Sequence, residues 1–461
     1  MYQINFDNPI NAYFIGIGGV SMSGLAMVLK DRGFTVSGSD RSESDATRSL
    51  ENAGIKVFIG QKSENLEAAK TPDLVVYTAA IHPDNPEFIK AKELSIPMLT
   101  RAELLGQIMK HYYLPVAVSG THGKTTTTGM ISKIMLEGNL DPTISIGGVL
   151  KDIGGNFRIG GSKYFVTEAC EYTNSFLSFF PGVGIILNID ADHLDFFKDL
   201  DDIRNSFHKF AKLLPENGTL VINGEIPNLS ELTKGLTCKI KTYGFSDEFD
   251  YYPTDITYDD FGNASFHINR KNSDGFDISL KVPGKHNISN AMAAAAAADV
   301  FEIPKAAIKS GLCSFTGTGR RFEYRGTVDG LTIIDDYAHH PTEISATLNA
   351  AGNYPHKKLW VVFQPHTFTR TKALMDNFAK ALLPADKIVL ADIYAARETD
   401  NLGISSRTLK EKIESLGHEC YYFPSFDEIE KFLLQNCTKD DMLITMGAGN
   451  VVDIANDLLG L

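Results

Sequence analysis

The stretch "SGTHGKTTTT", residues 119–128, has the residue types of a phosphate-binding loop. It follows the apolar run "PVAV" and precedes a helical pattern, which is the context that such a loop requires. Val118 stands where the usual G-x-x-x-x-G-K-[ST] pattern has its first glycine, so the loop is short. Backbone N–H groups, the Lys124 ammonium and the Thr125 hydroxyl would contact phosphate oxygens and a magnesium ion. The predicted nucleotide site comprises Gly120, Thr121, His122, Gly123, Lys124, Thr125 and Thr126.

Acidic side chains and a histidine follow two further predicted strands. The ends of "YFVTEACE" and "GIILNIDADHLDFF" carry Glu168, Glu171, Asp190, Asp192, His193 and Asp195. Because ligands gather beyond the carboxyl ends of parallel strands, we expect these groups to face the phosphate loop. Carboxylate oxygens with one imidazole nitrogen suit magnesium or manganese beside phosphates. Each residue alone would be a solvated loop residue, but their joint placement favours a metal site.

A glycine cluster lies near the N-terminus, between the apolar run "YFIGI" and an amphipathic helix that ends near Gly33. The cluster consists of Gly16, Gly18, Gly19 and Gly24. Such glycines let backbone N–H groups approach a diphosphate at a helix N-terminus, although a tight turn without a ligand is the alternative. Ser21 replaces the last glycine of G-x-G-x-x-G, so a nicotinamide cofactor is only one possibility and a UDP-sugar is another. Asp40 ends the second predicted strand, where it could meet a ribose hydroxyl.

Three α/β segments must position these groups. Apolar, strand-like runs alternate with helical stretches along the whole chain, which predicts doubly wound parallel sheets. The pattern restarts near Lys110 and near Cys313, so we predict three domains over residues 1–110, 111–313 and 314–461. The turn-rich stretch 245–273 and the following "GFDISLKVPGKHN" predict an antiparallel excursion within the central segment.

Composition argues against several classes of protein. A net charge of -13 over 461 residues does not suit a general nucleic-acid binder. No apolar run approaches the roughly 18 residues of a membrane span, and the N-terminus lacks the features of a secretory signal, so we expect a cytoplasmic protein. Five cysteines without a C-x-x-C pair support neither a disulfide framework nor a structural zinc site.

A series of motifs, in this order along essentially the whole chain, resembles the Mur ligases of peptidoglycan synthesis. The motifs are "GIGGVSMSGLA", "GTHGKTTTT", "EACE", "DADHLDFF", "GKHNISNA", "GTGRRFE", "DDYAHHPTEI", "FQPHTFTRT" and "MGAGN". The resemblance implies a Rossmann-like UDP-sugar-binding domain, a central P-loop ATPase-like domain and a Rossmann-like amino-acid-binding domain. It further implies that ATP phosphorylates the lactyl carboxylate of UDP-N-acetylmuramate, and that the L-alanine amine attacks this acyl phosphate. ADP and phosphate would be released.

The resemblance also implies roles for individual residues. Lys124 and Thr125 would contact the ATP phosphates and a first magnesium ion, Glu168 would share that metal, and His193 would ligate a second. Arg320 would reach the γ-phosphate, adding positive charge where two anions meet. The remaining expected contacts are His286, Asn287 and Asn290 for adenine; Gly18, Ser39, Asp40, His82 and Glu171 for the UDP-sugar; and Tyr337, His339, His366 and Arg370 for L-alanine.

Some points stay open at this stage. Thr367 stands where many relatives have Arg, so the number of guanidinium groups on the alanine carboxylate is undecided, and His208 and Lys209 give no basis for a carbamylated lysine. Either a neutral imidazole or the phosphate could accept the alanine proton. The choice among L-alanine, L-serine and glycine is not predicted, and a monomer or weak homodimer is expected.

Three alternative functions remain. A peptidoglycan-recycling ligase would add a tripeptide to the same UDP-sugar, but Tyr337 stands where such enzymes tend to carry Phe. An NAD-dependent oxidoreductase would leave Lys124 and Glu168 without a role. A catalytically inert UDP-sugar-binding protein would not need the residues of the ATP site.

Overall fold

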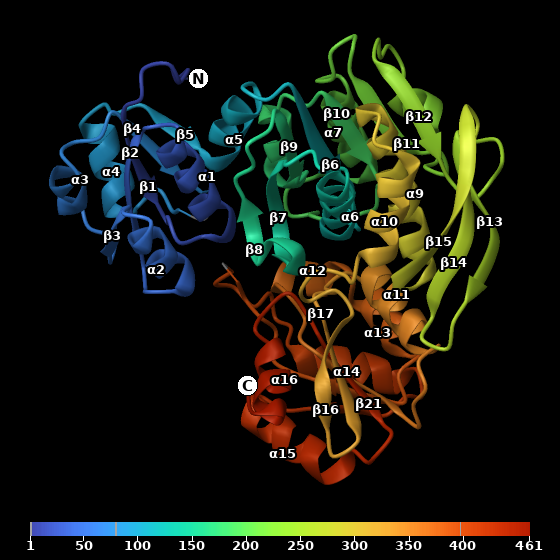
Figure 1. Cartoon of the computed structure of the whole chain (residues 1–461). Helices are drawn as coiled ribbons and strands as arrows, with labels where there is room; N and C mark the ends of the chain where they lie inside the picture. The colour runs from blue at the N-terminus through green and yellow to red at the C-terminus, as the bar shows by residue number, and fades with distance from the viewer. Residues whose placement is uncertain (1, 79–80, 397) are drawn as a thin grey trace.

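The computed structural model describes residues 2–78, 81–396 and 398–461, and its strands form three sheets that follow one another along the chain (Figure 1). Each sheet is covered by helices, so the predicted three-part α/β fold is confirmed. The sheets span residues 11–100, 114–283 and 323–446, and the exact domain boundaries stay a prediction.

The first sheet is parallel throughout and has the strand order β3-β2-β1-β4-β5. Its elements are β1 (Asn11–Ile15), α1 (Val20–Asp31), β2 (Thr35–Asp40), α2 (Asp45–Asn52), β3 (Lys56–Ile59), α3 (Glu64–Ala68), β4 (Leu74–Tyr77), α4 (Pro86–Glu93), β5 (Met98–Thr100) and α5 (Arg101–Met109). The strand order reverses between β1 and β4, which is where such sheets bind ligands. β1 ends before Gly16, whose φ of 81° turns the chain toward α1.

The central sheet has ten strands in the order β15-β14-β13-β12-β11-β10-β6-β9-β7-β8. These are β6 (Leu114–Ser119), β7 (Thr143–Leu150), β8 (Gly155–Arg158), β9 (Tyr164–Glu168), β10 (Val183–Ile186), β11 (Thr219–Asn223), β12 (Lys239–Tyr243), β13 (Tyr251–Tyr258), β14 (Asn263–Arg270) and β15 (Ser273–Pro283). The predicted antiparallel excursion is confirmed, since β14 pairs antiparallel with both β13 and β15. It continues the central sheet, because Tyr251 of β13 pairs with Tyr243 of β12.

Helices of the central domain pack closely on this sheet. They are α6 (Lys124–Glu137), η1 (Lys151–Ile153), η2 (Tyr172–Ser178), α7 (Leu200–Ala211), α8 (Leu229–Leu232), α9 (Lys285–Ala298), η3 (Asp299–Phe301) and α10 (Lys305–Ser314). The alanines of α9 are buried, and their small side chains let α6 approach closely. The sequence predicted a helix from Asn290, but α9 begins at Lys285 because Gly284, at φ 97°, turns the chain directly into it.

The third sheet has the order β16-β17-β21-β18-β19-β20, with β16 as an antiparallel edge. Its elements are β16 (Glu323–Val328), β17 (Leu331–Asp336), α11 (Pro341–Ala351), β18 (Leu359–Phe363), α12 (Phe368–Ala373), α13 (Met375–Leu382), β19 (Lys387–Leu390), α14 (Ser406–Ser415), β20 (Cys420–Tyr422), α15 (Phe426–Asn436), β21 (Met442–Met446) and α16 (Val452–Leu459). Trp360 of β18, the chain's one tryptophan, is buried and donates its indole N–H to Asp441 at 3.2 Å.

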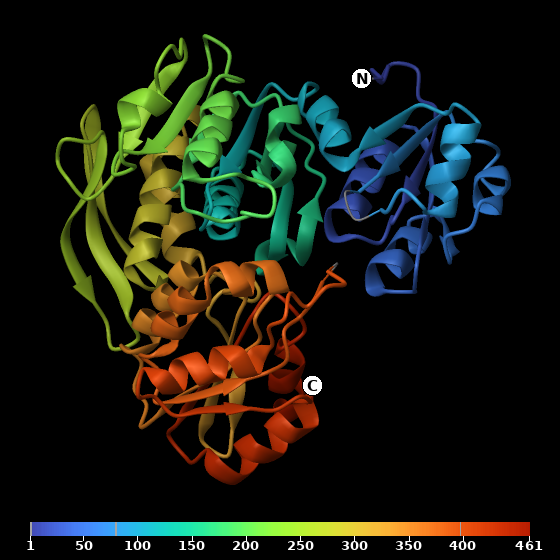
Figure 2. The ribbon, with the colours of Figure 1, turned by 180° about the vertical axis from the view of Figure 1, so that it is seen from behind.

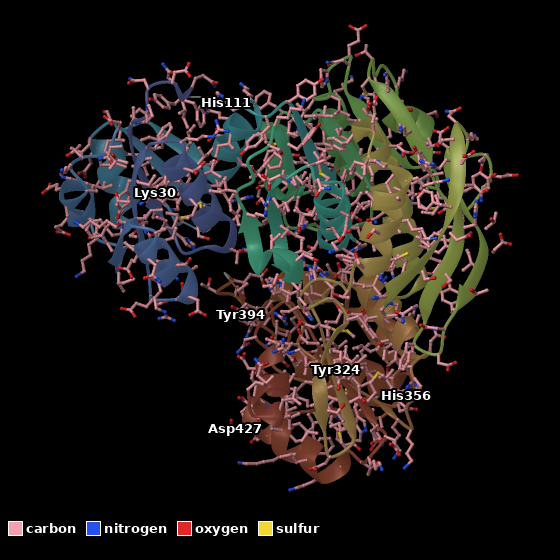
Figure 3. All side chains as sticks on the ribbon, in the orientation of Figure 1. Lys30, His111, Tyr324, His356, Tyr394 and Asp427 are labelled. Atoms are coloured by element: carbon pink, nitrogen blue, oxygen red, sulfur yellow. The ribbon has the colours of Figure 1, made fainter. Side chains whose placement is uncertain are left out.

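The central domain contacts both of the other domains. The first domain meets the central one beside α5, β7 and β8, and the third lies below the central domain near α11 and α12, as views from both sides show (Figures 1 and 2). Tyr394, on the third domain, lies at the edge that faces the other two (Figure 3). Within the described ranges, helices are too short or too polar to cross a membrane.

Candidate active site between the central and third domains

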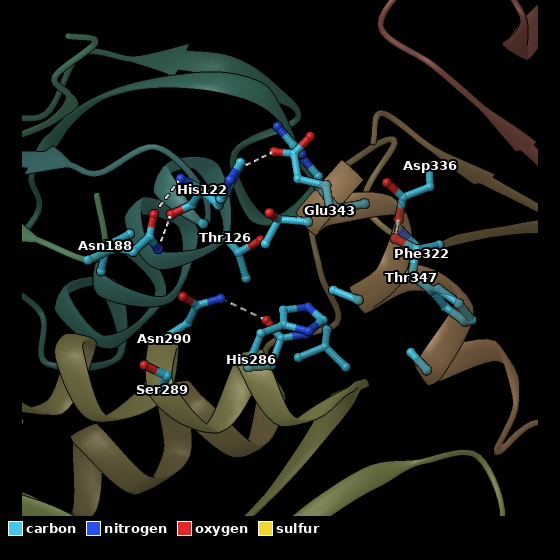
Figure 4. A pocket seen from close by; sticks show the side chains of 18 of the residues that line it. His122, Thr126, Asn188, His286, Ser289, Asn290, Phe322, Asp336, Glu343 and Thr347 are labelled. Carbon is cyan, nitrogen blue, oxygen red and sulfur yellow. Dashed lines mark hydrogen bonds and ion pairs between the residues drawn. The ribbon is translucent and has the colours of Figure 1, made fainter. Parts of the chain in front are cut away.

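The phosphate loop connects β6 to α6, and neighbouring side chains hold its shape. Gly120 and Gly123 have φ angles of 138° and 84°, which favour glycine. Asn188, just after β10, accepts a hydrogen bond from the His122 N–H at 2.8 Å and donates one to the His122 carbonyl at 3.0 Å (Figure 4). The Thr121 hydroxyl accepts from the Asp190 N–H at 2.9 Å. The loop is therefore held in place by residues beyond the neighbouring strand.

Lys124 lies over this loop and is paired with a buried carboxylate. Its Nζ donates to the carbonyl of Gly120 at 2.6 Å and to Glu171 Oε2 at 3.0 Å. Burial by itself lowers the pKa of Lys124, but the Glu171 carboxylate outweighs it and raises the pKa above the ordinary value. The ammonium thus stays charged, as a phosphate contact requires. Glu171, which we expected at the UDP-sugar, lies against Lys124, and its contact with the sugar stays a prediction.

Two consecutive glycines of β7 lie against two of the predicted magnesium ligands, Glu168 and Thr125. The Gly147 N–H donates to Glu168 Oε1 at 2.6 Å, and a Cβ there would lie 3.0 Å from Glu168 Oε2. A Cβ on Gly148 would lie 3.1 Å from the Thr125 methyl. Side chains at these positions would therefore crowd Glu168 and Thr125. A carboxylate and a hydroxyl are oxygen ligands of the kind that magnesium prefers, so these residues fit the ion, and the metal site stays a prediction.

His193, the third predicted magnesium ligand, lies in the loop after β10. It has a left-handed φ of 54° and stacks on Tyr172 with ring centroids 4.5 Å apart. Burial is the main cause that lowers its pKa, which favours the neutral imidazole that binds metals.

His122, Asp190 and His340 also have ligand atoms within 4.8 Å of one another, and no other such group occurs among the described residues. The ring nitrogens of His122 already contact Asp190 at 3.3 Å and Glu343 at 3.1 Å. Those of His340 contact the Ala191 carbonyl and the Thr342 N–H, at 3.2 and 3.3 Å. These contacts join the central domain to the third, so we assign the cluster to domain contact rather than to a metal.

A cavity of about 320 Å³ lies between the central and third domains (Figure 4). It is lined by His122, Gly123, Thr126, His286, Asn287 and Asn290, so it gathers six of the predicted ATP residues. Asn290 donates to Asn287 at 2.9 Å, and Asn287 donates to the Pro283 carbonyl at 2.8 Å. The opposite wall comes from α11 and includes Glu343 and Thr347. A nucleotide here would contact two domains at once.

The two neighbouring arginines of "GTGRRF" lie in different surroundings. Arg320 donates to Asp335 at 2.8 Å and to the carbonyls of Gly449 and Gly447 at 2.9 and 2.8 Å, all within the third domain. Arg321 lines the nucleotide cavity, 3.9 Å from Glu343. The γ-phosphate contact of Arg320 stays a prediction. Arg321 had no predicted role, but its guanidinium is the one at the cavity, and no signal in the sequence distinguishes the two arginines.

A second cavity, of about 650 Å³, gathers all four residues predicted for L-alanine, namely Tyr337, His339, His366 and Arg370. Asp192 and His193 belong to its central-domain wall, and the Arg370 Nε donates to Asp192 Oδ1 at 3.0 Å across the domain boundary. Thr367 also lines it, and its hydroxyl accepts from the Arg370 N–H at the start of α12. Tyr172, Lys372 and Glu398 line it too and were not predicted, because single polar residues carry no motif.

The expected diphosphate site in the first domain is formed by β1, β2 and α1. The Gly18 N–H donates to Asp40 Oδ2 at 2.8 Å, so the two predicted residues lie together. The Ser39 hydroxyl points into the core and donates to buried Glu87 at 2.5 Å, while its carbonyl accepts the Gly16 N–H at 2.8 Å. Ser39 thus shapes the turn. His82 is exposed, and its contact with the UDP-sugar stays a prediction.

Three family descriptions match consecutive parts of the chain. Residues 11–113 match "Mur ligase family, catalytic domain", residues 118–298 match "Mur ligase middle domain", and residues 320–449 match "Mur ligase, glutamate ligase domain". A protein of Agathobacter rectalis named UDP-N-acetylmuramate–L-alanine ligase is 58% identical over 459 residues, covering 100% of both chains. The chain belongs to the Mur ligase family.

Other relatives agree with this assignment. A UDP-N-acetylmuramate–L-alanine ligase of Lachnospira eligens is 56% identical over 460 residues, covering 100% of each chain. The crystal structure of a UDP-N-acetylmuramate-alanine ligase from Thermotoga maritima has a TM-score of 0.82 at 29% identity, with 98% of each chain covered. A murein peptide ligase from Psychrobacter arcticus has a TM-score of 0.73 at 25% identity, with the same coverage. The expected membership of the Mur ligases is confirmed.

Proposed function

We propose that this Mur ligase uses ATP to join L-alanine to the lactyl carboxylate of UDP-N-acetylmuramate in peptidoglycan precursor synthesis. One observation carries the proposal: the short segment after β10 lines both cavities, with Asp190 in the nucleotide cavity and Asp192 and His193 in the second. A phosphoryl group and an incoming amine would therefore approach the same point from two sides. The names of relatives at 58% and 56% identity support the same reaction.

The first step activates a carboxylate, which resonance and negative charge make a poor electrophile. Transfer of the γ-phosphoryl group to a carboxylate oxygen gives an acyl phosphate and ADP, and the two anions must be held together during this step. The charged Lys124 supplies one counter-charge, and Arg321 at the nucleotide cavity would supply another. Magnesium bound by Thr125, Glu168 and His193 would supply further positive charge between the anions.

The second step is attack by the alanine amine on the acyl carbon, with release of phosphate. Arg370 is placed to bind the alanine carboxylate, as its guanidinium already binds a carboxylate, that of Asp192. Burial lowers the pKa of His339 and of His366 to about 4, so both rings stay neutral at physiological pH. Such weakly basic rings are poor acceptors for an ammonium proton, which favours a phosphate oxygen as the acceptor.

Phosphate release from ATP tests the proposal. It should require UDP-N-acetylmuramate and an amino acid together, and L-alanine should give a higher kcat/KM than L-serine, glycine or the recycling tripeptide. Phosphate release no faster than background with both substrates present would contradict ligase activity. A preference for the tripeptide would assign the chain to the recycling reaction.

Chelation tests the metal separately. Removal of divalent cations should abolish phosphate release, and magnesium should restore it, while binding of UDP to the first domain should stay unchanged. We also propose a cytoplasmic location, supported by the water-soluble nucleotides that the reaction consumes. The monomer or weak homodimer expected from the sequence stays a prediction.

A further inference from the structure

The first and central domains meet where Gly24 packs against Phe157. Gly24 is buried in the middle of α1, although glycine is a poor helix former. A Cβ built at this position would lie 2.2 Å from Phe157 Cδ2 and 2.4 Å from its Cγ. Because Cγ lies close to the backbone, rotation of the ring cannot make room for an added methyl group. The fourth glycine of the N-terminal cluster therefore serves a contact between domains.

Phe157 lies on the β7–β8 hairpin, residues 143–158, which also contacts α1 through a hydrogen bond. Asn156 of β8 donates its side-chain N–H to the carbonyl of Val20, the first residue of α1, at 2.9 Å. The hairpin lies directly beside α1 in both views of the molecule (Figures 1 and 2). One hairpin thus contacts the N-terminal end of the helix at which the diphosphate is expected.

The same hairpin also contacts residues of the expected ATP and magnesium site. Gly147 donates to Glu168, and Gly148 lies against Thr125, so β7 borders the two oxygen ligands of the proposed magnesium site. The carbonyl of Val149 accepts the Gly319 N–H at 2.8 Å, in the segment that leads to Arg321. The β7–β8 hairpin therefore contacts the helix expected at the UDP-sugar, the two residues proposed to bind magnesium, and the segment that leads into the third domain.

We propose that Phe157, packed on Gly24, is a positioning residue that sets the distance between the UDP-sugar carboxylate and the γ-phosphate. The inference rests on the proposed function, in which the sugar nucleotide and ATP are bound by different domains. Phe157 lines neither of the two cavities described above, so it would act through the placement of α1. Since a misplacement of about 1 Å can lower a reaction rate about 100-fold, a shift of α1 on the hairpin should slow phosphoryl transfer without weakening either substrate's binding.

The test is the Gly24→Ala variant, measured by single-turnover acyl phosphate and phosphate formation. We expect the rate constant to fall about 100-fold, while the dissociation constants for UDP and for ADP change less than about twofold. Gly155→Ala is the matched control, since it lies on the same hairpin and its added Cβ has nothing within 4 Å. It should keep the wild-type rate.

A second substitution separates positioning from loss of structure. In Gly24→Ala/Phe157→Ala the added methyl has room, so the double variant should react at least about fivefold faster than Gly24→Ala alone. Phe157→Ala alone should be about tenfold slower than wild type with unchanged affinities, and it carries the test if Gly24→Ala does not fold.

A wild-type rate in Gly24→Ala or in Phe157→Ala would overturn the positioning role. The role would also be overturned if Gly24→Ala weakened UDP binding and lowered the unfolding temperature, and if the double variant Gly24→Ala/Phe157→Ala restored neither. The wild-type enzyme in the same assay tests the proposed function on its own, so its failure is distinguishable from a failure of the variants.

Discussion

His122 of the phosphate loop contacts Glu343 of the third domain, with Nδ1 and Oε1 3.1 Å apart (Figure 4). The other ring nitrogen lies 3.3 Å from Asp190 of the central domain. The loop that is expected to bind ATP is therefore also a point of attachment for the domain expected to bind L-alanine. Closure of the third domain on the central one and the shape of the phosphate loop depend on the same side chain.

This attachment predicts a dependence of stability on pH. Burial alone lowers the pKa of His122, but its bonds to Asp190 and Glu343 outweigh it and raise the pKa from 6.5 to about 9. A raised pKa in the folded state stabilises the protein fully below pH 6.5, and this stabilisation is lost as the pH rises through 9. Wild type should thus lose about 1 to 3 kcal/mol more than His122→Gln between pH 6.5 and 9.5 in denaturant unfolding. Parallel curves for the two proteins would exclude this role for His122.

Lys124→Ala should lower turnover about 10²- to 10³-fold while the affinity for UDP-N-acetylmuramate stays within about twofold. The ammonium lies on the phosphate loop, and the sugar nucleotide is expected on the first domain. Steady-state kinetics and calorimetric titration with the sugar nucleotide measure the two quantities. Because the substitution leaves the buried Glu171 carboxylate without the Lys124 ammonium, the unfolding temperature of the variant is the control for loss of structure. Loss of sugar affinity with normal ATP use would contradict the assignment of substrates to domains.

The two arginines of "GTGRRF" should differ in their effects. Arg321→Ala should raise the KM for ATP and lower kcat, each about tenfold, because its guanidinium lines the nucleotide cavity. Arg320→Ala should act mainly through stability, since it leaves buried Asp335 without its ion-pair partner. Thermal unfolding beside ATP-dependent kinetics separates the two outcomes. A normal unfolding temperature with lost ATP use in Arg320→Ala would instead support its predicted contact with the γ-phosphate.

Arg370→Lys should raise the KM for L-alanine about 10- to 100-fold and change the KM for ATP little. Lysine keeps the positive charge but loses the paired N–H groups that bind a carboxylate in a fixed orientation. Lys372→Ala, on the same wall of the second cavity, is the comparison for a general change in charge. If both variants change the KM for L-alanine equally, Arg370 has no specific contact with the amino acid.

Gly147→Ala should raise the magnesium concentration needed for half-maximal rate about tenfold. Its Cβ would lie 3.0 Å from Glu168 Oε2 and displace the carboxylate from the proposed metal. A magnesium titration at saturating ATP measures the effect, with Gly155→Ala as the control in open space. An unchanged magnesium requirement would show that Glu168 is not a ligand.

The alternation of strand and helix patterns predicted the fold correctly, because each α/β unit forms its pattern locally. The phosphate loop could also be placed at a strand end, where a Gly-Lys-Thr segment has a distinctive composition. Contacts between domains could not be predicted from the sequence. Arg370 and Asp192 are 178 positions apart, and neither residue's neighbours indicate the other.

The arginine pair shows a second limit. Arg320 has a left-handed φ of 59°, so the chain turns there and the two neighbouring side chains leave in different directions. Nothing in the local sequence requires a left-handed conformation at a non-glycine residue. A shared motif therefore identified the segment but not the guanidinium that reaches the cavity.

Trp360 gives the third domain an intrinsic optical label. It is the chain's one tryptophan, and it is buried in β18 with its indole N–H bonded to Asp441. Tryptophan emission during denaturation will follow the third domain alone, while far-ultraviolet circular dichroism averages over all three. If the two signals change at different denaturant concentrations, the third domain unfolds as a separate cooperative unit. If a ligand then couples the domains, the denaturation midpoints of the two signals will move closer together, and no added dye is needed to measure this.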